Sequence, residues 1–280
     1  MIELKRQMDK EISIQKAKEM VPALTNNIPA SGMSLKYETI NTLDIVQEFI
    51  NLGWVITKAS TDSGYKHIYD DKYRTHFITL QNPKLKSPVD NTFYEIIISN
   101  SYNGKSRFQV QLGLYRLVCA NGMIAFTDVV QPITVKHIGE GARVVVDKVM
   151  ETILYQMQIV ETQTQKWNNT KLNDKQINQL AGKILKARMG KDFKPHKEQI
   201  KQITNIQRDE DKDNNVWEVF NRIQENVIQG NFEFRKSKRG PKGFFVTKTI
   251  QARGMEKPTV LKRFNEKIWE LTNKIVEEVK

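Results

Sequence analysis

The sequence of 280 residues contains one cysteine, Cys119, and only four histidines. A single cysteine excludes an intramolecular disulfide and is typical of a protein kept in a reducing compartment. No run approaches the roughly 18 apolar residues of a membrane-spanning helix, and residues 1–20 lack the apolar core of a secretory signal. We therefore expect a cytoplasmic protein without a membrane partner.

Motifs for nucleotide and metal chemistry are also missing. No Gly-x-x-x-x-Gly-Lys-Ser/Thr loop is present, and no Gly-x-Gly-x-x-Gly follows an expected strand. The spacing of His67, His76, His137 and His196 does not match a zinc site, and one cysteine cannot form a Cys-x-x-Cys pair. We expect no cofactor and no metal, and we do not expect an enzyme.

Two weaker candidates for a reactive site are present. Cys119 would need a neighbouring base to become a thiolate, and His137 could approach it across a sheet. The carboxylates within residues 209–213 could bind a cation. We favour a structural interpretation of both, namely a small buried cysteine and a solvated loop.

The pattern of apolar residues divides the chain into a β-rich part and a helical part. Short apolar or alternating runs predict strands at 54–57, 74–81, 92–99, 106–126 and 133–137, the fourth being too long for one strand. Three-to-four-residue spacing predicts helices at 142–167, from 173 or 174 to 190, at 216–230 and from 258 to about 275. Asn41 is expected to cap an earlier helix, and the charged segment 191–212 is expected to be a loop or a frayed helix.

The sharpest local signal is the pair Asn103-Gly104. It favours a two-residue type I′ turn, because both positions of that turn need positive φ. The flanking runs 94–98 and 108–112 should therefore pair as an antiparallel hairpin.

The order of elements predicts an α+β fold, because helices do not alternate with strands as they do in βαβ units. We expect an antiparallel β-meander packed against a long helix, followed by a helical C-terminal region. The expected domains are a variable N-terminal segment at 1–37, the α+β core at 38–170 and a helical, basic region at 171–280. Trp217, Phe220, Phe264 and Trp269 fit either a core or an interface.

The net charge of +12 is placed unevenly. Residues 1–60 carry equal numbers of acidic and basic side chains, whereas residues 231–280 carry thirteen basic and six acidic ones. Between Arg235 and Arg263 there are ten basic residues and one acid, Glu256. Such a cluster attracts polyanions, and we expect nucleic acid as the partner.

Glycine and phenylalanine residues are interspersed among the basic residues of 234–254. Glycine lets the backbone approach phosphates, and basic side chains release counterions there. The phenylalanines at 234, 244 and 245 could stack on unpaired bases or could anchor a strand to the core. The expected nucleic-acid-binding residues are Lys183, Lys186, Arg188, Arg235, Lys236, Lys238, Arg239, Lys242, Lys248 and Arg253.

Two segments carry a family resemblance: Asn100-Ser101-Tyr102-Asn103-Gly104 and Arg116-Leu117-Val118-Cys119-Ala120-Asn121-Gly122-Met123. They resemble the hallmark of a phage- and plasmid-borne family with a domain of unknown function. Lys136-His137-Ile138-Gly139 and the segment 215–221 resemble two later elements of that family. Tyr102-Asn103 stand where the family has His-Asp, so a role of that pair would not carry over. The resemblance implies a mobile-element protein in the cytoplasm of a bacterial host.

A β-meander followed by a long helix also resembles the single-strand annealing proteins RecT, Redβ and Erf. This second resemblance implies binding of single-stranded DNA in a basic groove, assembly into homo-oligomers and no need for a nucleotide. We therefore expect a DNA-binding protein of recombination or replication, with single-stranded DNA favoured. The alternatives are a protein-binding inhibitor of a host defence system and another phage accessory protein without nucleic-acid binding. A third alternative is an enzyme that uses Cys119 or a carboxylate site not visible as a motif.

Overall fold

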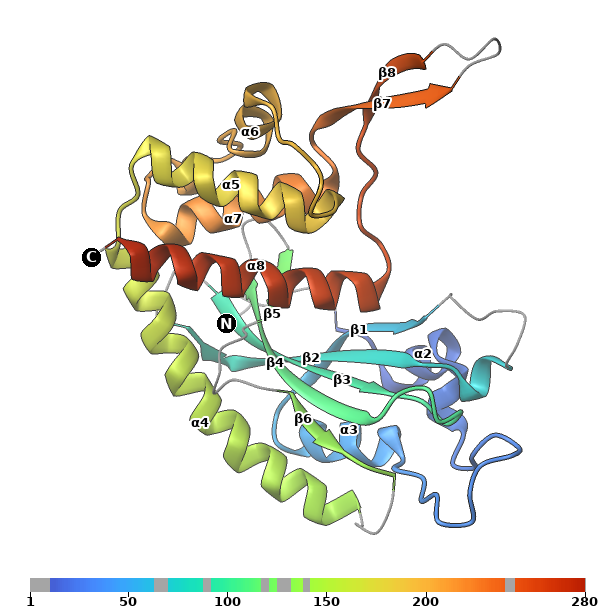
Figure 1. Cartoon of the computed structure of the whole chain (residues 1–280). Coiled ribbons are helices and arrows are strands. Elements are labelled where there is room, and N and C mark those ends of the chain that lie inside the picture. The colour runs from blue at the N-terminus through green and yellow to red at the C-terminus, as the bar shows by residue number, and fades with distance from the viewer. Residues whose placement is uncertain are drawn as a thin grey trace. The chain divides into compact units, whose positions relative to one another are not determined.

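The computed structural model describes residues 11–62, 70–87, 92–116, 121–124, 132–137, 142–239 and 245–279 (Figure 1). The chain divides into two compact units. Unit 1 comprises residues 1–162 and 257–259, and unit 2 comprises residues 163–256 and 260–280. The domain boundaries expected at residues 37 and 170 stay predictions. Within the described residues, no helix is both long and apolar enough to cross a bilayer.

Unit 1 contains an antiparallel sheet whose strands β1 to β5 lie side by side in sequence order. The strands are β1 (Val55–Thr61), β2 (His76–Lys86), β3 (Thr92–Asn100), β4 (Phe108–Arg116), β5 (Asn121–Ile124) and β6 (Ile133–Val135). β5 pairs with the end of β4, and β6 pairs with its beginning. The predicted α+β class and the β-meander are confirmed.

The β3–β4 hairpin has the predicted pairing but not the predicted turn. Ile96 pairs with Leu112 and Ile98 with Val110. Residues 101–107 connect the strands, so a two-residue turn at Asn103-Gly104 is wrong. Side chains bind the loop backbone instead: the Ser101 hydroxyl accepts a hydrogen bond from Ser106 N at 2.9 Å. Such local polar bonds offer the backbone an alternative to a tight turn.

A buried polar network joins the start of helix α3 (Thr42–Asn51) to the strands. The predicted cap is confirmed, since the Asn41 side chain accepts a hydrogen bond from Leu43 N at 2.9 Å. The hydroxyl of Thr42 lies 2.9 Å from His76 Nε2 and accepts a hydrogen bond from Asn100 Nδ2 at 3.0 Å. These side chains are fully buried. The network therefore connects α3 with the start of β2 and the end of β3.

The remaining helices of unit 1 cover its sheet from several parts of the chain. They are α2 (Ile14–Met20), the 3₁₀ helices η1 (Pro22–Thr25) and η3 (Asp71–Tyr73), and α4 (Ala142–Asn169), whose last residues belong to unit 2. Burial raises the pKa of Tyr94 on β3 to about 12, and the charge of Glu161 on α4 adds to this shift. The predicted packing of the meander against a long helix is confirmed.

Unit 2 is mainly helical. It contains α5 (Asp174–Met189), α6 (Lys197–Ile203), the 3₁₀ helix η4 (Asp209–Asp211), α7 (Val216–Gln229) and most of α8 (Pro258–Glu278). The ring of Trp167 lies 4.3 Å from that of Trp269 and 5.1 Å from that of Phe220. Trp217 and Phe264 are buried as well, so these aromatic side chains belong to a core.

A second sheet in unit 2 was not expected. The basic segment forms an antiparallel hairpin of β7 (Glu233–Arg239) and β8 (Phe245–Gln251), and we call this pair of strands the basic hairpin. The sequence of β8 is rich in Phe, Val, Thr and Ile, which favour strands. The glycines that drew attention in the sequence lie at 240, 243 and 254, outside both strands.

Gly230 ends α7, and its backbone lies close to the backbone of Ala252 and Arg253, which follow β8. Its φ is 77°. A Cβ atom at this position would lie 2.5 Å from the carbonyl oxygen of Ala252. A side chain at residue 230 would therefore meet both backbone strain and a steric clash.

We expect Gly230→Ala to lower the free energy of unfolding by about 1–3 kcal/mol. Gly182 in α5 is the matched control, because a Cβ there meets no atom within 4 Å. Gly182→Ala should stabilise the protein by about 0.5–1 kcal/mol, since alanine favours a helix. Urea unfolding of both variants tests this prediction, and equal shifts in one direction would contradict it.

A second prediction concerns His76. Burial lowers its pKa to about 4, from the usual histidine value of 6.5. The unfolded chain therefore takes up a proton below about pH 6.5, whereas the native protein does so only near pH 4, and stability is lost as the pH falls through this window. Between pH 7 and pH 5 the loss should be about 2 kcal/mol.

The measurement is urea unfolding at pH 7 and pH 5 for the unmodified protein, His76→Gln and His196→Gln. His76→Gln should remove about 2 kcal/mol of the pH dependence. His196 is exposed, so its variant should keep that dependence. An unchanged pH dependence in His76→Gln would show that His76 is not its source.

Candidate nucleic-acid interface

The basic hairpin carries half of the ten nucleic-acid-binding residues that the sequence predicts. Arg235, Lys236, Lys238 and Arg239 lie on β7, and Lys248 lies on β8. Arg235 and Lys248 are exposed, and neither forms an ion pair with a residue that the structure describes. The side chains of residues 236–239, like the whole of Lys242, lie outside the described part. Figure 1 shows the two strands extending away from α5, α6 and α7 of the same unit.

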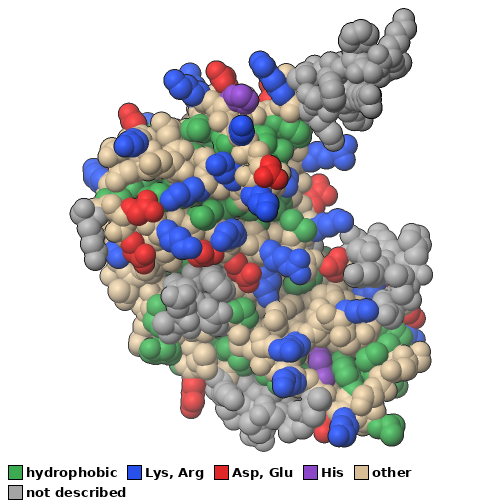
Figure 2. Space-filling model, in the orientation of Figure 1, with side chains coloured by type: hydrophobic (Ala, Val, Ile, Leu, Met, Phe, Trp, Pro, Cys, Tyr) green, Lys and Arg blue, Asp and Glu red, His purple; other side chains and the backbone are tan. Residues whose placement is uncertain are grey.

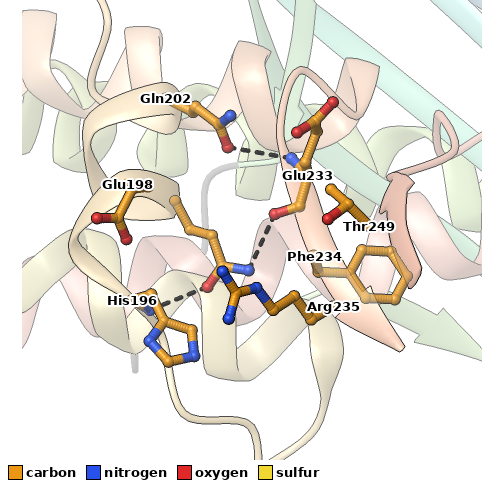
Figure 3. A pocket seen from close by; sticks show the side chains of 8 residues that line it. His196, Glu198, Gln202, Glu233, Phe234, Arg235 and Thr249 are labelled. Atoms are coloured by element: carbon orange, nitrogen blue, oxygen red, sulfur yellow. Dashed lines mark hydrogen bonds between the residues drawn. The ribbon is translucent and has the colours of Figure 1, made fainter. Parts of the chain in front are cut away.

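Two glutamine side chains of α6 hold the beginning of β7 (Figure 3). The Gln199 amide nitrogen donates to Glu233 O at 2.9 Å, and the Gln202 side-chain oxygen accepts from Glu233 N at 3.0 Å. Gln199 also accepts a hydrogen bond from His196 N at 2.9 Å. The edge of β7 thus receives from side chains the bonds that a third strand would supply. Within the charged segment 191–212, expected to be a loop or a frayed helix, Lys197–Ile203 form α6 and Asp209–Asp211 a 3₁₀ helix, and the residues between them are not helical.

Arg188 holds the other side of the hairpin base. Its Nη2 donates to Arg253 O at 2.9 Å. Burial lowers the pKa of the Arg188 guanidinium, and its Nε atom has no hydrogen-bond partner among the residues that the structure describes. Backbone bonds complete the base, since Ala252 N donates to Phe232 O at 2.9 Å. Arg188 therefore positions the chain that leaves β8, a role that its sequence position did not reveal.

A cavity of about 260 Å³ lies between α6 and the base of the basic hairpin. It is lined by His196 and Glu198 from the α6 side and by Phe234, Arg235 and Thr249 from the hairpin. The Arg235 side chain extends toward His196 (Figure 3). Carboxylates of Glu198 and Glu233 line the same cavity, so its charge is mixed. An anion would be attracted more strongly by the outer part of the hairpin, which has no acidic residue after Glu233.

The predicted nucleic-acid-binding residues on α5 are Lys183, Lys186 and Arg188, and only some of them are free to bind a ligand. Lys183 lies 3.5 Å from the carboxylate of Glu278. Lys186 is exposed and forms no ion pair within the described residues. Of the three predicted residues on α5, Lys186 is therefore the one whose charge is open to a partner. Arg253, beyond β8, is also exposed, and its carbonyl oxygen accepts the hydrogen bond from Arg188.

Sequence reasoning missed four lysines that precede and follow the start of α6. They are exposed and have no ion pair among the residues described: Lys191, Lys194, Lys197 and Lys201. His196, next to Lys197, lines the cavity with Arg235, which brings this segment close to the hairpin base. Figure 2 shows Lys and Arg side chains over the visible surface of these helices, with Asp and Glu between them. The density of lysine in 191–201 was the available signal.

The two weaker candidates for a reactive site were Cys119 with His137 and the carboxylates within residues 209–213. Cys119 lies outside the described residues. His137 stacks on Tyr37 with ring centroids 4.7 Å apart, and its Nδ1 lies 3.2 Å from Glu38 O. In the acidic run, Asp211 is buried and its carbonyl accepts a hydrogen bond from Arg222 at 3.0 Å. Among the described residues, no three His, Cys, Asp or Glu side chains are placed to hold a metal ion.

The chain matches a family model described as "Domain of unknown function (DUF932)" over residues 31–269. UPF0380 protein YfjQ of Escherichia coli (strain K12) is 25% identical over 256 residues, which cover 91% of this chain and 89% of the relative. UPF0380 protein YafZ of the same organism is 33% identical over 146 residues, 52% of each chain. No solved structure matches this chain.

The family model covers most of both units, and the predicted membership of a family with a domain of unknown function is confirmed in that form. The chain belongs to the DUF932 domain family.

Proposed function

We propose that this protein binds nucleic acid through the basic hairpin and acts in DNA recombination or replication. The observation that carries the proposal is the concentration of basic residues in and around the hairpin. From Arg235 to Arg253 the chain has seven basic residues and no acidic one. Polyphosphate is the biological polyanion that a row of such residues suits best, because each contact releases a bound counterion.

The arrangement of acids in unit 2 supports this assignment. Acidic side chains occur beside the basic residues of the helical part: Arg208 pairs with Glu225, and Lys171 lies 3.3 Å from Asp213. The side chains of Arg235 and Lys248 have no such partners among the described residues. An exposed cation that forms no ion pair keeps more of its long-range attraction for an anionic ligand than a paired one does.

The biological setting in the proposal rests on sequence resemblance. A phage or plasmid origin follows from the likeness of residues 100–104 and 116–123 to that family. Strand annealing follows from the likeness in element order to RecT, Redβ and Erf. These resemblances favour a homo-oligomer in the cytoplasm of the host, with single-stranded DNA as the ligand.

We expect the variant Arg235→Gln/Lys248→Gln/Arg253→Gln to bind oligonucleotides more weakly than the unmodified protein. Six to ten phosphate contacts predict a loss of about 10³–10⁵ in affinity between 50 and 200 mM salt. If all three cations contact phosphates, the slope of log K against log salt should fall by about three. Fluorescence anisotropy with labelled single-stranded DNA, duplex DNA and RNA at several salt concentrations measures both quantities.

The matched control is Lys16→Gln/Lys36→Gln/Lys105→Gln, which removes three exposed charges from unit 1. This control should keep most of the affinity and the salt slope. Equal losses in the two triple variants would show that net charge acts without a site. If the unmodified protein bound no oligonucleotide at 50 mM salt, the proposal would be wrong and the protein-binding alternative would be favoured.

A further inference from the structure

The basic residues of the hairpin are divided between its two faces. Successive strand positions lie on opposite faces, and direct partners across an antiparallel pair share a face. Lys236 pairs with Lys248 in the β7–β8 register. Positions Lys236, Lys238 and Lys248 therefore lie on one face, which we call the lysine face. Positions Arg235 and Arg239 lie on the other, the arginine face.

The register also places like charges opposite each other. Lys236 and Lys248 are direct Cα partners, an arrangement that costs stability when no anion is near. Glu233 at the start of β7 is the acidic residue of the two strands, and it pairs with Gln251 at the hairpin base. By its position, Glu233 shares the arginine face with Arg235, so the two strands place no carboxylate on the lysine face.

The hairpin extends away from the helices of its own unit (Figure 1). Its strands pair with each other and with no other strand among the described residues. Among the described residues, its hydrogen bonds to the helices and their ends lie at the base, at Glu233 on β7, Gln251 on β8 and Arg253 beyond β8. Each strand has seven residues, so the hairpin is about 23 Å long.

Duplex DNA offers a matching shape. Its major groove is about 12 Å wide and admits a two-stranded β-ribbon, and a row of phosphates borders the groove on each side. A hairpin with cations on both faces can approach both rows at once. A single strand presents one row of phosphates and would leave the cations of one face without a partner. The major groove of A-form RNA is deep and narrow, so it does not suit the hairpin.

We propose that the basic hairpin enters the major groove of double-stranded DNA, with the lysine face toward one row of phosphates and the arginine face toward the other. This inference rests on the proposed function and specifies its ligand. It differs from the single strand that the sequence resemblance favours, because it follows from the register of β7 and β8.

The test compares two double variants with the same change in charge. Lys236→Gln/Lys238→Gln alters the lysine face, and Arg235→Gln/Arg239→Gln alters the arginine face. Each is titrated, in the full-length chain, against a 30-base-pair duplex and a 30-nucleotide single strand of the same sequence. We expect the duplex to bind more tightly, and each double variant to lower the salt slope for the duplex by about two. The quadruple variant should lower it by about four.

Two outcomes would overturn the inference and leave the proposed function standing. One is a loss of duplex binding confined to a single face, and the other is tighter binding of the single strand than of the duplex. Absence of binding to either ligand by the unmodified protein would overturn both proposals. Thermal unfolding of each variant checks the fold, and hydrogen exchange at the backbone of 233–239 and 245–251 checks that the hairpin itself is formed.

Discussion

The basic hairpin depends on the hydrogen bonds that α6 makes to the backbone of Glu233. An isolated two-stranded hairpin is at best marginally stable in water. Gln199 and Gln202 bind the carbonyl and the amide of one residue, so they hold both the position and the direction of the first strand. Arg188 and the close approach of Gly230 to Ala252 hold the chain that leaves the second strand. Hydrogen bonds from α6 and α5 therefore hold the base of the hairpin at both of its strands, and most of the basic residues lie farther along the strands.

This arrangement separates two uses of basic residues in one unit. Partly buried cations need acceptors, and they have them: Arg222 donates to the carbonyl of Asp211 at 3.0 Å, and Arg208 pairs with Glu225. Exposed cations on the hairpin do not need acceptors for the fold, because water solvates them. The register pairs position 236 with position 248, both lysine, and like charges placed directly opposite one another lower the stability of an antiparallel pair. A segment that keeps such repulsion is better explained by a polyanionic partner than by stability.

Most of the residues that carry the family resemblance lie in another unit than the residues that carry the proposed function. Segments 100–104 and 116–123 belong to unit 1, whereas the basic hairpin belongs to unit 2, together with the family-like segment 215–221. The family model spans both, but its description names no activity. The proposal of nucleic-acid binding therefore rests on charge, register and hairpin geometry alone. Unit 1 contributes a sheet whose buried network around Thr42 is satisfied internally, so that network is best understood as structural.

The sequence by itself determined the features that depend on neighbouring residues. The cap at Asn41, the helix ends at Gly190 and Gly230, and the pairing of the runs around Ile96 and Leu112 could all be predicted. Each of these signals is local, or compares two runs of similar pattern close together in the chain. The α+β class followed from their order, because order alone separates a meander from βαβ units.

Only the tertiary structure decided which predicted basic residues are available. Arg188 binds a carbonyl 65 residues away, and Lys183 pairs with a carboxylate 95 residues away, which no local pattern reveals. The basic segment was predicted as a glycine-rich stretch, yet it is a hairpin held by side chains of α6. The two faces of that hairpin follow from its register, and a shift by one residue would exchange them. Composition therefore placed the charge along the chain, while strand pairing and the packing of α5 and α6 determined which charges are open to a partner.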